Sequence, residues 1–298
     1  MKLLIVTQAV DTEDPILGFF VRWIEEFAKH AERIEVICLR EGKHDLSANV
    51  RVHSLGKETG VSRVKYVLNF YRYIWNLRHD YDAVFVHMNP EYVVLGGPFW
   101  RLWNKRISLW YMHKSVDLKL RIAAQLADVI FTASKESFRL KSSKVRVMGH
   151  GIDTDFFSPD TNILRENWLL SVGRLMPSKR HDIAIRIATQ DGKELRIAGE
   201  GSERKKLEAL ASELGARVSF LGALTQSQLR DKYRKARYLI HTSETGSLDK
   251  VVLEALACGL PVRTNDPALK ALENVGPAYV RDNHSLHRLI PAILDGML

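Results

Sequence analysis

Strand-length apolar runs alternate with helical patterns along the whole chain, and this alternation constrains the fold more than any other feature of the sequence. Strands of a parallel sheet are buried on both faces, so they are nearly continuous apolar runs joined by helices. One alternating set runs from the N-terminus to about residue 150, and a second begins at 168–172. The sequence therefore predicts an α/β protein with two Rossmann-like domains that face each other across a cleft.

The two domains are predicted to meet in the linker-like segment 155–160, so that they span residues 1–157 and 158–298. The expected strands are 2–7, 34–39, 51–54, 83–87, 107–112, 129–133, 145–148, 168–172, 194–198, 218–221, 238–241 and 261–264. The expected helices are 19–30, 62–78, 91–104, 119–127, 135–141, 181–189, 203–214, one from Thr225, 248–257 and a final helix. Ser202 is expected to cap helix 203–214, and Thr225 with Gln228 has the pattern of a capping box.

Composition narrows the class of protein. An apolar fraction of 46% over 298 residues is typical of a globular chain. Cys38 and Cys258 lie in apolar stretches without a CxxC pattern, which indicates buried thiols in a reducing compartment and no structural metal. The first residues lack the features of a signal peptide, and no apolar run is long enough to cross a bilayer. We therefore expect a cytoplasmic protein.

The first strand-to-helix turn argues against a dinucleotide-dependent enzyme. Residues 8–18 contain no GxGxxG pattern and instead form a long loop that ends at Gly18. Gly18 either lets the backbone approach a ligand in the cleft or simply starts the following helix.

Charged residues and glycines follow two strands of the second half. Arg174 and Lys179 come shortly after Gly173, and they supply a fork of donors and a mobile point charge that suit a diphosphate. Gly199 and Gly201 end the next strand, where they suit either close approach to a ligand or a simple turn.

The segment 242–262 predicts a strand end, a turn of small residues and the start of a helix. The unpaired N–H groups and the positive dipole end of a helix N-terminus attract phosphate. The residues expected at this start are Gly246, Ser247, Leu248, Asp249 and Lys250. Glu254 lies further along the helix, where it can reach the ribose of a nucleotide whose diphosphate lies at the helix start.

Together these segments resemble the motif series of the family 4 retaining glycosyltransferases, which have the two-Rossmann GT-B fold. The resemblance rests on Gly173–Lys179, Gly199–Gly201, Leu221–Gly222 and Leu253–Val262, and it is strongest over about residues 165–265. In the first half, 127–134 and 149–153 resemble the segments that end the family's first domain. The resemblance implies an acceptor-binding N-terminal domain and a donor-binding C-terminal domain.

The resemblance also implies roles for single residues. Glu254 matches the acid that holds the nucleotide ribose, and Arg174 and Lys179 match the basic pair on the donor diphosphate. His113 matches a histidine near the donor sugar; the alternative is a histidine packed at a strand terminus. His87 has a similar position with weaker support. Glycines expected to line the donor are Gly173, Gly199, Gly201 and Gly222.

One departure from the family pattern concerns the paired acids. The first acid precedes the second by eight positions in the family, which places Gly246 where a glutamate is expected. Glu244 and Asp249 are the nearest acids, and either can contact the sugar hydroxyls; Asp249 can instead cap the helix. Lys250 adds a cation beside the expected phosphate position.

The resemblance implies transfer of a hexose, with retention of configuration, from a UDP- or GDP-sugar to a glycan or lipid-linked acceptor. The sequence has no aspartate pair with a third ligand, so we expect no metal and no cofactor, with Arg174 and Lys179 in the place of Mg²⁺. Because Gly246 stands where a glutamate is expected, an alternative is that the chain is a catalytically silent partner subunit that binds a nucleotide sugar. An oxidoreductase of the same architecture is the third reading.

Basic and aromatic residues gather in the segments 62–78 and 99–106. Residues 63–121 contain ten Lys and Arg but only four Asp and Glu, and the whole chain has a net charge of +9. Either the aromatic side chains pack on the sheet while the cations stay solvated, or these helices lie on an anionic membrane. We expect weak association with the inner face of the membrane and no nucleic-acid partner. The family's helix that crosses back to the first domain is expected to be missing after the final helix.

Overall fold

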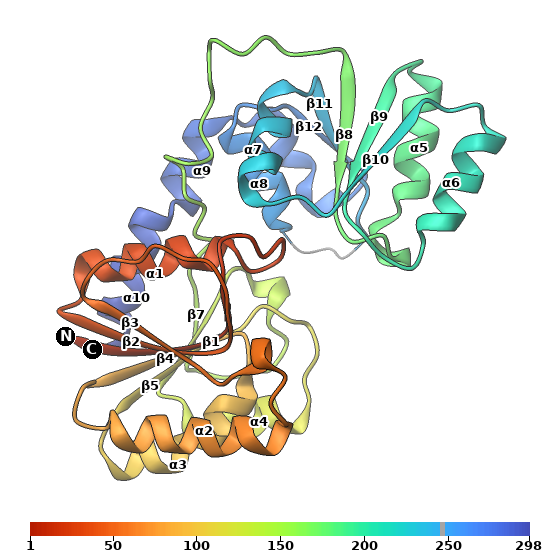
Figure 1. The fold of residues 1–298 in the computed structure, drawn as a ribbon. Coiled ribbons are helices and arrows are strands. Elements are labelled where there is room, and N and C mark those ends of the chain that lie inside the picture. Colours follow the sequence, from red (N-terminus) through yellow and green to blue (C-terminus); the bar gives the residue numbers. More distant parts are fainter. Residues whose placement is uncertain (245–247) are drawn as a thin grey trace. The chain divides into compact units, whose positions relative to one another are not determined.

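The computed structural model describes residues 1–244 and 248–298, and it divides into two compact α/β units (Figure 1). The first unit consists of Met1–Gly151 together with Leu286–Leu298, and the second of Ile152–Ser285. Each unit has its own parallel sheet and its own core, so the prediction of two Rossmann-like units is confirmed.

The first unit is built on a seven-stranded parallel sheet with the strand order β3-β2-β1-β4-β5-β6-β7. Its strands are β1 (Lys2–Val10), β2 (Arg33–Glu41), β3 (Val50–Ser54), β4 (Ala83–His87), β5 (Arg106–Trp110), β6 (Val129–Thr132) and β7 (Val145–Val147). Its helices are α1 (Phe19–His30), α2 (Arg63–Asn76), α3 (Pro90–Leu102), α4 (Leu118–Leu126) and α10 (Leu286–Met297). The 3₁₀ turns are η1 (Lys57–Thr59) and η2 (Lys135–Ser137).

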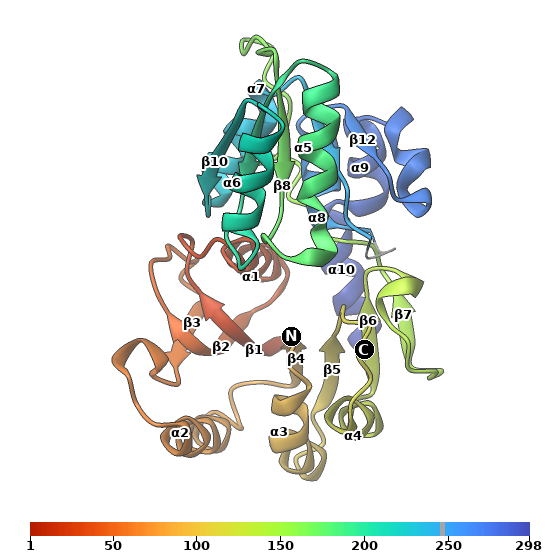
Figure 2. The ribbon, with the colours of Figure 1, turned by 90° about the vertical axis from the view of Figure 1, so that its right-hand side faces the viewer.

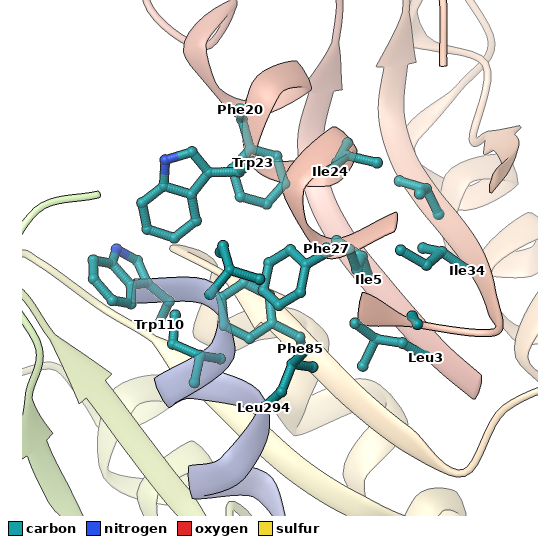
Figure 3. Packing of buried hydrophobic residues seen from close by; sticks show 14 of the residues in the cluster. Leu3, Ile5, Phe20, Trp23, Ile24, Phe27, Ile34, Phe85, Trp110 and Leu294 are labelled. Carbon is teal, nitrogen blue, oxygen red and sulfur yellow. The ribbon is translucent and has the colours of Figure 1, made fainter. Parts of the chain in front are cut away.

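Aromatic side chains fill the core on the α1 face of this sheet. Figure 3 shows these aromatic side chains: Trp23 of α1 contacts Trp110 of β5, Phe27 of α1 contacts Phe85 of β4, and Phe20 lies beside Trp23. Trp23 and Trp110 meet edge to face, with ring centroids 4.9 Å apart. Burial of side chains of this size contributes about 1.5–3 kcal/mol each, so α1 is one of the main elements that hold the sheet.

The helix α10 belongs to the first unit, although it ends the chain. It packs against α1, β5 and β6 (Figure 1). Its apolar face is buried and comprises Leu286, Leu289, Ile290, Ile293, Leu294 and Met297. Its His287 Nδ1 lies 2.9 Å from the buried carboxylate of Glu26 on α1. The expected domain 158–298 and the expected absence of a returning helix are therefore wrong, because an apolar stripe this wide can be buried only against another element.

The second unit has a five-stranded parallel sheet with the order β10-β9-β8-β11-β12. Its strands are β8 (Trp168–Val172), β9 (Glu194–Ala198), β10 (Val218–Gly222), β11 (Tyr238–His241) and β12 (Val262–Thr264). Its helices are α5 (His181–Gln190), α6 (Arg204–Glu213), α7 (Gln226–Lys235), α8 (Lys250–Ala257) and α9 (Pro277–His284). The 3₁₀ segments are η3 (Pro177–Lys179) and η4 (Pro267–Asn274). Figure 2 shows α5 and α6 together on one face of this sheet, and α8 lies on the other face.

Local signals predicted most of these elements but not all of their ends. The capping box is confirmed, since the Thr225 side chain accepts from the Gln228 N–H and the Gln228 side chain accepts from the Thr225 N–H. Helix α6 begins after Glu203, so the expected cap at Ser202 is wrong. The single final helix is three segments, η4, α9 and α10: Gly276 and Pro277 separate η4 from α9, and the extended residue Ser285, which forms a β-bridge with Ile152, separates α9 from α10. None of the described helices is long and apolar enough to cross a membrane.

Candidate functional site

The candidate site of the second unit lies where the carboxyl ends of β8 and β11 are adjacent. These strands are neighbours at the point where the strand order reverses, which is where α/β sheets bind ligands. The loop after β8 and the loop after β11 are joined by two hydrogen bonds. Thr242 Oγ1 donates to the carbonyl of Lys179 at 3.0 Å, and the Glu244 N–H donates to the carbonyl of Ser178 at 3.1 Å.

Lys179 and Asp249 meet at the centre of these loops. Lys179 Nζ lies 2.5 Å from Asp249 Oδ2 and 3.3 Å from Ser243 Oγ. His241, at the end of β11, places Nε2 2.9 Å from the same carboxylate oxygen, and its Nδ1 lies 3.1 Å from Thr264 Oγ1. The three charged or titratable side chains therefore form one connected array.

The array keeps Asp249 ionised. Burial acts to raise the pKa of this carboxyl, but the hydrogen bond with His241 and the positive charge of Lys179 outweigh it and lower the pKa to about 2. Within the described residues, the Asp249 side chain makes no capping hydrogen bond to α8, although Asp249 holds the N-cap position. The structure thus directs the Asp249 side chain toward Lys179, so the alternative that this side chain caps α8 is wrong.

The second nearby acid is also paired with a cation. Glu244 contacts the guanidinium of Arg180, and Arg180 also lies 3.1 Å from Asp182. Arg180 has a φ of 48°, in the left-handed region that favours glycine, and it ends the 3₁₀ turn η3 just before α5. The Arg180 side chain thus joins the start of α5 to the loop after β11.

His181 closes the base of the β8 loop. It is 3% exposed, its Nδ1 lies 2.9 Å from Ser171 Oγ, and its Nε2 has no hydrogen-bond partner among the described residues. Burial lowers the pKa of this histidine to about 4, so the ring is neutral near pH 7. A Cβ on Gly173 would lie 3.7 Å from His181 Nε2 and 3.5 Å from Lys179 Cδ. Gly173, Lys179 and His181 therefore border one small space.

Arg174 extends from this loop into solvent. Its side chain is exposed, and the described part of the chain offers it neither a hydrogen bond nor an ion pair. A free guanidinium at the carboxyl end of β8 is available to an anionic ligand.

Glu254 lies inside the second unit. Its residue is 1% exposed, Tyr233 donates a hydrogen bond to Oε2 at 3.2 Å, and Lys250 Nζ lies 3.3 Å from Oε1. Burial and the neighbouring Glu254 charge raise the pKa of the fully buried Tyr233 well above 10, so the phenol keeps its proton and donates it to the carboxylate. The expected contact of Glu254 with a ribose stays a prediction.

The two glycines that follow β9, Gly199 and Gly201, are required by contacts with the loop after β8. A Cβ on Gly199 would lie 2.0 Å from the carbonyl oxygen of Gly173, and one on Gly201 would lie 2.3 Å from that of Leu175. Gly222 has a φ of 73°, and its carbonyl accepts from the Gly199 N–H at 2.7 Å. Loop-to-loop packing thus explains Gly199 and Gly201, which the sequence left open between a ligand contact and a turn.

The remaining expected site residues of the second unit lie at the start of α8. Gly246 and Ser247 fall outside the described residues. Leu248 packs against the apolar cluster that contains α8, and helix α8 begins only at Lys250.

In the first unit, Gly18 is explained by its own turn. A Cβ there would lie 2.6 Å from the carbonyl oxygen of Asp14, and the Gly18 N–H donates to that oxygen at 2.9 Å. The preceding loop is shorter than expected because β1 continues to Val10.

The two first-unit histidines differ in environment. His87 is 2% exposed and stacks on Phe20 with ring centroids 3.9 Å apart, as expected of a core histidine. His113 is exposed after β5, with its ring edge-on to Tyr111 at 5.6 Å. It is therefore accessible to a ligand of the first unit.

Three residues of the candidate site were missed from the sequence. His241, Ser243 and His181 carry no motif signal of their own, because their positions matter only through the pairing of β8 with β11. One signal was available: polar residues directly after two buried strands of a parallel sheet converge at the same edge.

Comparison with known proteins gives a family for part of the chain. Residues 153–282 match the family model of glycosyl transferases group 1. A GDP-mannose-dependent alpha-mannosyltransferase of Mycobacterium tuberculosis is 32% identical over 170 residues, which cover 54% of this chain and 42% of that protein. A D-inositol 3-phosphate glycosyltransferase of Mycolicibacterium smegmatis is 34% identical over 137 residues, 40% of this chain and 32% of that protein. The match spans less than half the length of these relatives.

Solved structures resemble the whole chain. Sucrose-phosphate synthase from Thermosynechococcus elongatus has a TM-score of 0.75 at 15% identity, covering 99% of this chain and 98% of that chain. Anabaena Alr3699/HepE, crystallised in complex with UDP and glucose, has a TM-score of 0.71 at 15% identity, with 99% of each chain covered. The GT-B fold class expected from the sequence is thereby confirmed.

Proposed function

We propose that this chain, whose residues 153–282 form a glycosyl transferases group 1 domain, transfers a hexose from a UDP- or GDP-sugar to a glycan or lipid-linked acceptor. The observation that carries the proposal is the contact of Lys179, from the loop after β8, with Asp249 at the start of α8, at the carboxyl edge of the second sheet; Arg174 lies exposed on the same loop. Cations and helix N–H groups at one place suit the diphosphate of such a donor. Among the relatives, one is named for GDP-mannose and one structure holds UDP.

In the proposed reaction, Lys179 and Arg174 stabilise the negative charge that develops on the departing diphosphate. The acceptor hydroxyl forms its bond to the anomeric carbon on the face that the diphosphate leaves, and the diphosphate takes the hydroxyl proton. Configuration is then retained without a protein nucleophile, and the two cations act in the place of a metal ion. Electrostatic stabilisation of the leaving group supplies most of the rate enhancement.

The other predicted residues fit roles around this centre. Glu254 would accept hydrogen bonds from the ribose hydroxyls, in exchange for its contact with Lys250. His113 of the first unit would contact the donor sugar, since its ring is exposed after β5. Glu244 would reach the sugar hydroxyls only after it leaves Arg180.

The first unit has a surface suited to a membrane-bound acceptor on the inner face of the membrane. Large apolar side chains of α2 and α3 are exposed, including Leu68 at 62%, Trp75 at 53% and Leu102 at 76%. A groove of about 460 Å³ runs between these helices beside Trp75 and Trp103. Arginines and lysines of the same segments would contact anionic headgroups while the apolar side chains enter the interface.

A silent, nucleotide-sugar-binding subunit is the second candidate function. The observation that favours it is the pairing of both substitute acids: Glu244 contacts Arg180 and Asp249 contacts Lys179, so neither is free for a sugar hydroxyl. This candidate predicts nucleotide binding without turnover.

Thermal shift with UDP, GDP, ADP, CMP and NAD, followed by hydrolysis assays with the matching sugar nucleotides, tests the proposal. We expect stabilisation by UDP or GDP and slow release of free sugar. Stabilisation without any hydrolysis or transfer to supplied acceptors would favour the silent subunit. No shift with any nucleotide diphosphate would contradict both candidates.

A further inference from the structure

We propose that Asp249 is an internal anion that competes with the donor diphosphate for Lys179 and so lowers the affinity of the site for nucleoside diphosphates. The inference rests on the proposed function, because it takes Lys179 as a diphosphate ligand. It assigns Asp249 a role in setting donor affinity, in place of contact with sugar hydroxyls or capping of α8.

The first step of the argument is the position of the carboxylate. Asp249 is the N-cap residue of α8, and its Oδ2 lies 2.5 Å from Lys179 Nζ. A helix start attracts anions, and the cation that contacts the Asp249 carboxylate there is Lys179, whereas Lys250 on α8 contacts Glu254. The carboxylate therefore occupies the surroundings that favour a phosphate oxygen.

The second step is that the carboxylate is held there. His241 Nε2 lies 2.9 Å from Asp249 Oδ2, and His241 is 4% exposed and tied through Nδ1 to Thr264 Oγ1. A buried partner with fixed orientation leaves the Asp249 side chain few other positions. Displacement of Asp249 by a ligand must break its pairing with Lys179 while its negative charge stays nearby.

The third step is the charge that a ligand meets. Lys179 and Asp249 together carry no net charge, and neither do Arg180 and Glu244, which form an ion pair at the adjacent loop. A bound diphosphate can therefore interact with Arg174 without competition, but it must compete with the Asp249 carboxylate for Lys179. A carbon added at Gly173 would be in ordinary van der Waals contact with Lys179 Cδ and His181 Nε2, so one atom fits beside Lys179 at this point.

Calorimetric titration of the full chain with UDP, GDP and inorganic pyrophosphate tests the inference. Asp249→Asn keeps the size of the side chain and removes the charge, and we expect it to bind the preferred diphosphate at least tenfold more tightly than the parent. Asp182→Asn is the matched control, since it removes one carboxylate charge from the neighbouring Arg180 pair. We expect that control to change the affinity less than threefold.

A double-mutant cycle separates competition from a general charge effect. In a Lys179→Met background, Asp249→Asn should raise the affinity less than threefold, because no shared cation remains. Asp249→Ser serves as the second variant if Asp249→Asn does not fold, as judged by its thermal unfolding. An affinity that falls or stays within threefold in both Asp249 variants would overturn the inference while leaving the proposed function intact.

Two further outcomes keep the hypotheses distinct. Binding by Asp249→Asn with no measurable binding by the parent would support the inference in its strongest form. Failure of the parent and both Asp249 variants to bind any of the three compounds would overturn the proposed function itself, and this inference with it.

Discussion

At the level of single residues, the site contains two cations that are already paired with carboxylates and one, Arg174, that is exposed. Lys179 is paired with Asp249, Arg180 with Glu244, and Arg174 extends into solvent. A cation that is partly buried contributes more to ligand binding than one that is fully hydrated. Lys179 should therefore be the more important of the two predicted diphosphate ligands.

Replacement of Lys179 by alanine should weaken diphosphate binding and turnover by about 2–3 kcal/mol, because a charge-assisted hydrogen bond in a poorly hydrated site is lost. Arg174→Ala should have a smaller effect in the same direction. Calorimetry with UDP or GDP and measurement of kcat/KM check both. Lys193→Ala is the control, since Lys193 lies before β9 and bonds to Asn167 before β8, at the opposite edge of the sheet. Equal affinity for all four proteins would contradict the site assignment.

His181 should make stability depend on pH. Burial lowers its pKa from 6.5 to about 4, so between these values the unfolded chain binds a proton that the folded chain does not. The free energy of unfolding is therefore unaffected by this proton above pH 6.5. As the pH falls toward 4, the free energy of unfolding decreases by about 3 kcal/mol in total. Urea unfolding of the parent and of His181→Gln over this range measures the difference. Between pH 6.5 and 4, the free energy of unfolding should fall more for the parent than for His181→Gln. Equal dependence on pH for the two proteins would contradict the prediction.

At the scale of elements, the loops after β8, β9 and β10 behave as one packed layer. The Gly173 N–H donates to the carbonyl of Ala198 at 3.0 Å, and the Leu175 N–H donates to that of Glu200 at 2.8 Å. These contacts hold the β8 loop against its neighbour, so the position of Lys179 depends on glycines that lie far from it in sequence.

Gly199→Ala should therefore lower both stability and nucleotide affinity. The new Cβ would meet a backbone oxygen at 2.0 Å, so the loops must separate, which we expect to cost about 3 kcal/mol or more. Gly192→Ala is the control: it has a φ of 62° but no atom within 4 Å of the added Cβ, so only the backbone penalty of about 1–2 kcal/mol applies. Thermal unfolding and calorimetry compare them. The prediction is wrong if Gly199→Ala is the milder change.

The exposed faces of α2 and α3 carry the prediction of membrane association. Leu68→Glu and Leu102→Glu should each reduce binding to vesicles that contain anionic lipid, since a carboxylate replaces apolar surface at the interface. Leu164→Glu in the second unit, 87% exposed, is the matched control. Co-sedimentation with vesicles at low and high salt measures the effect. If all three variants sediment like the parent, these helices do not contact the membrane.

At the scale of the whole molecule, the chain returns to the unit in which it began. Helix α10 follows the second unit in sequence but completes the core of the first, against α1 and the sheet. The stability of the first unit therefore depends on residues at the far end of the chain.

Ile293→Ala should destabilise the first unit by about 2–5 kcal/mol, because Ile293 is fully buried and its loss leaves a cavity. Leu298→Ala, at 78% exposed, should have almost no effect. Tryptophan fluorescence during urea unfolding is a suitable measurement, since Trp168 is the sole tryptophan of the sequence outside residues 1–110. A fluorescence transition unchanged by Ile293→Ala would contradict the role of α10.

Several features could be predicted from the sequence alone: the two alternating sets of strands and helices, the helix 19–30, the capping box at Thr225 and the loop that carries Lys179. These features depend on periodicity and capping over a few consecutive residues, so they can be recognised within a short segment of the sequence. Three contacts could be known only from the three-dimensional structure: Asp249 with Lys179, Gly199 with Gly173, and α10 with the first unit. The residues that make these contacts are 26 to about 260 positions apart. The local pattern of each segment does not say which strands become neighbours in a sheet.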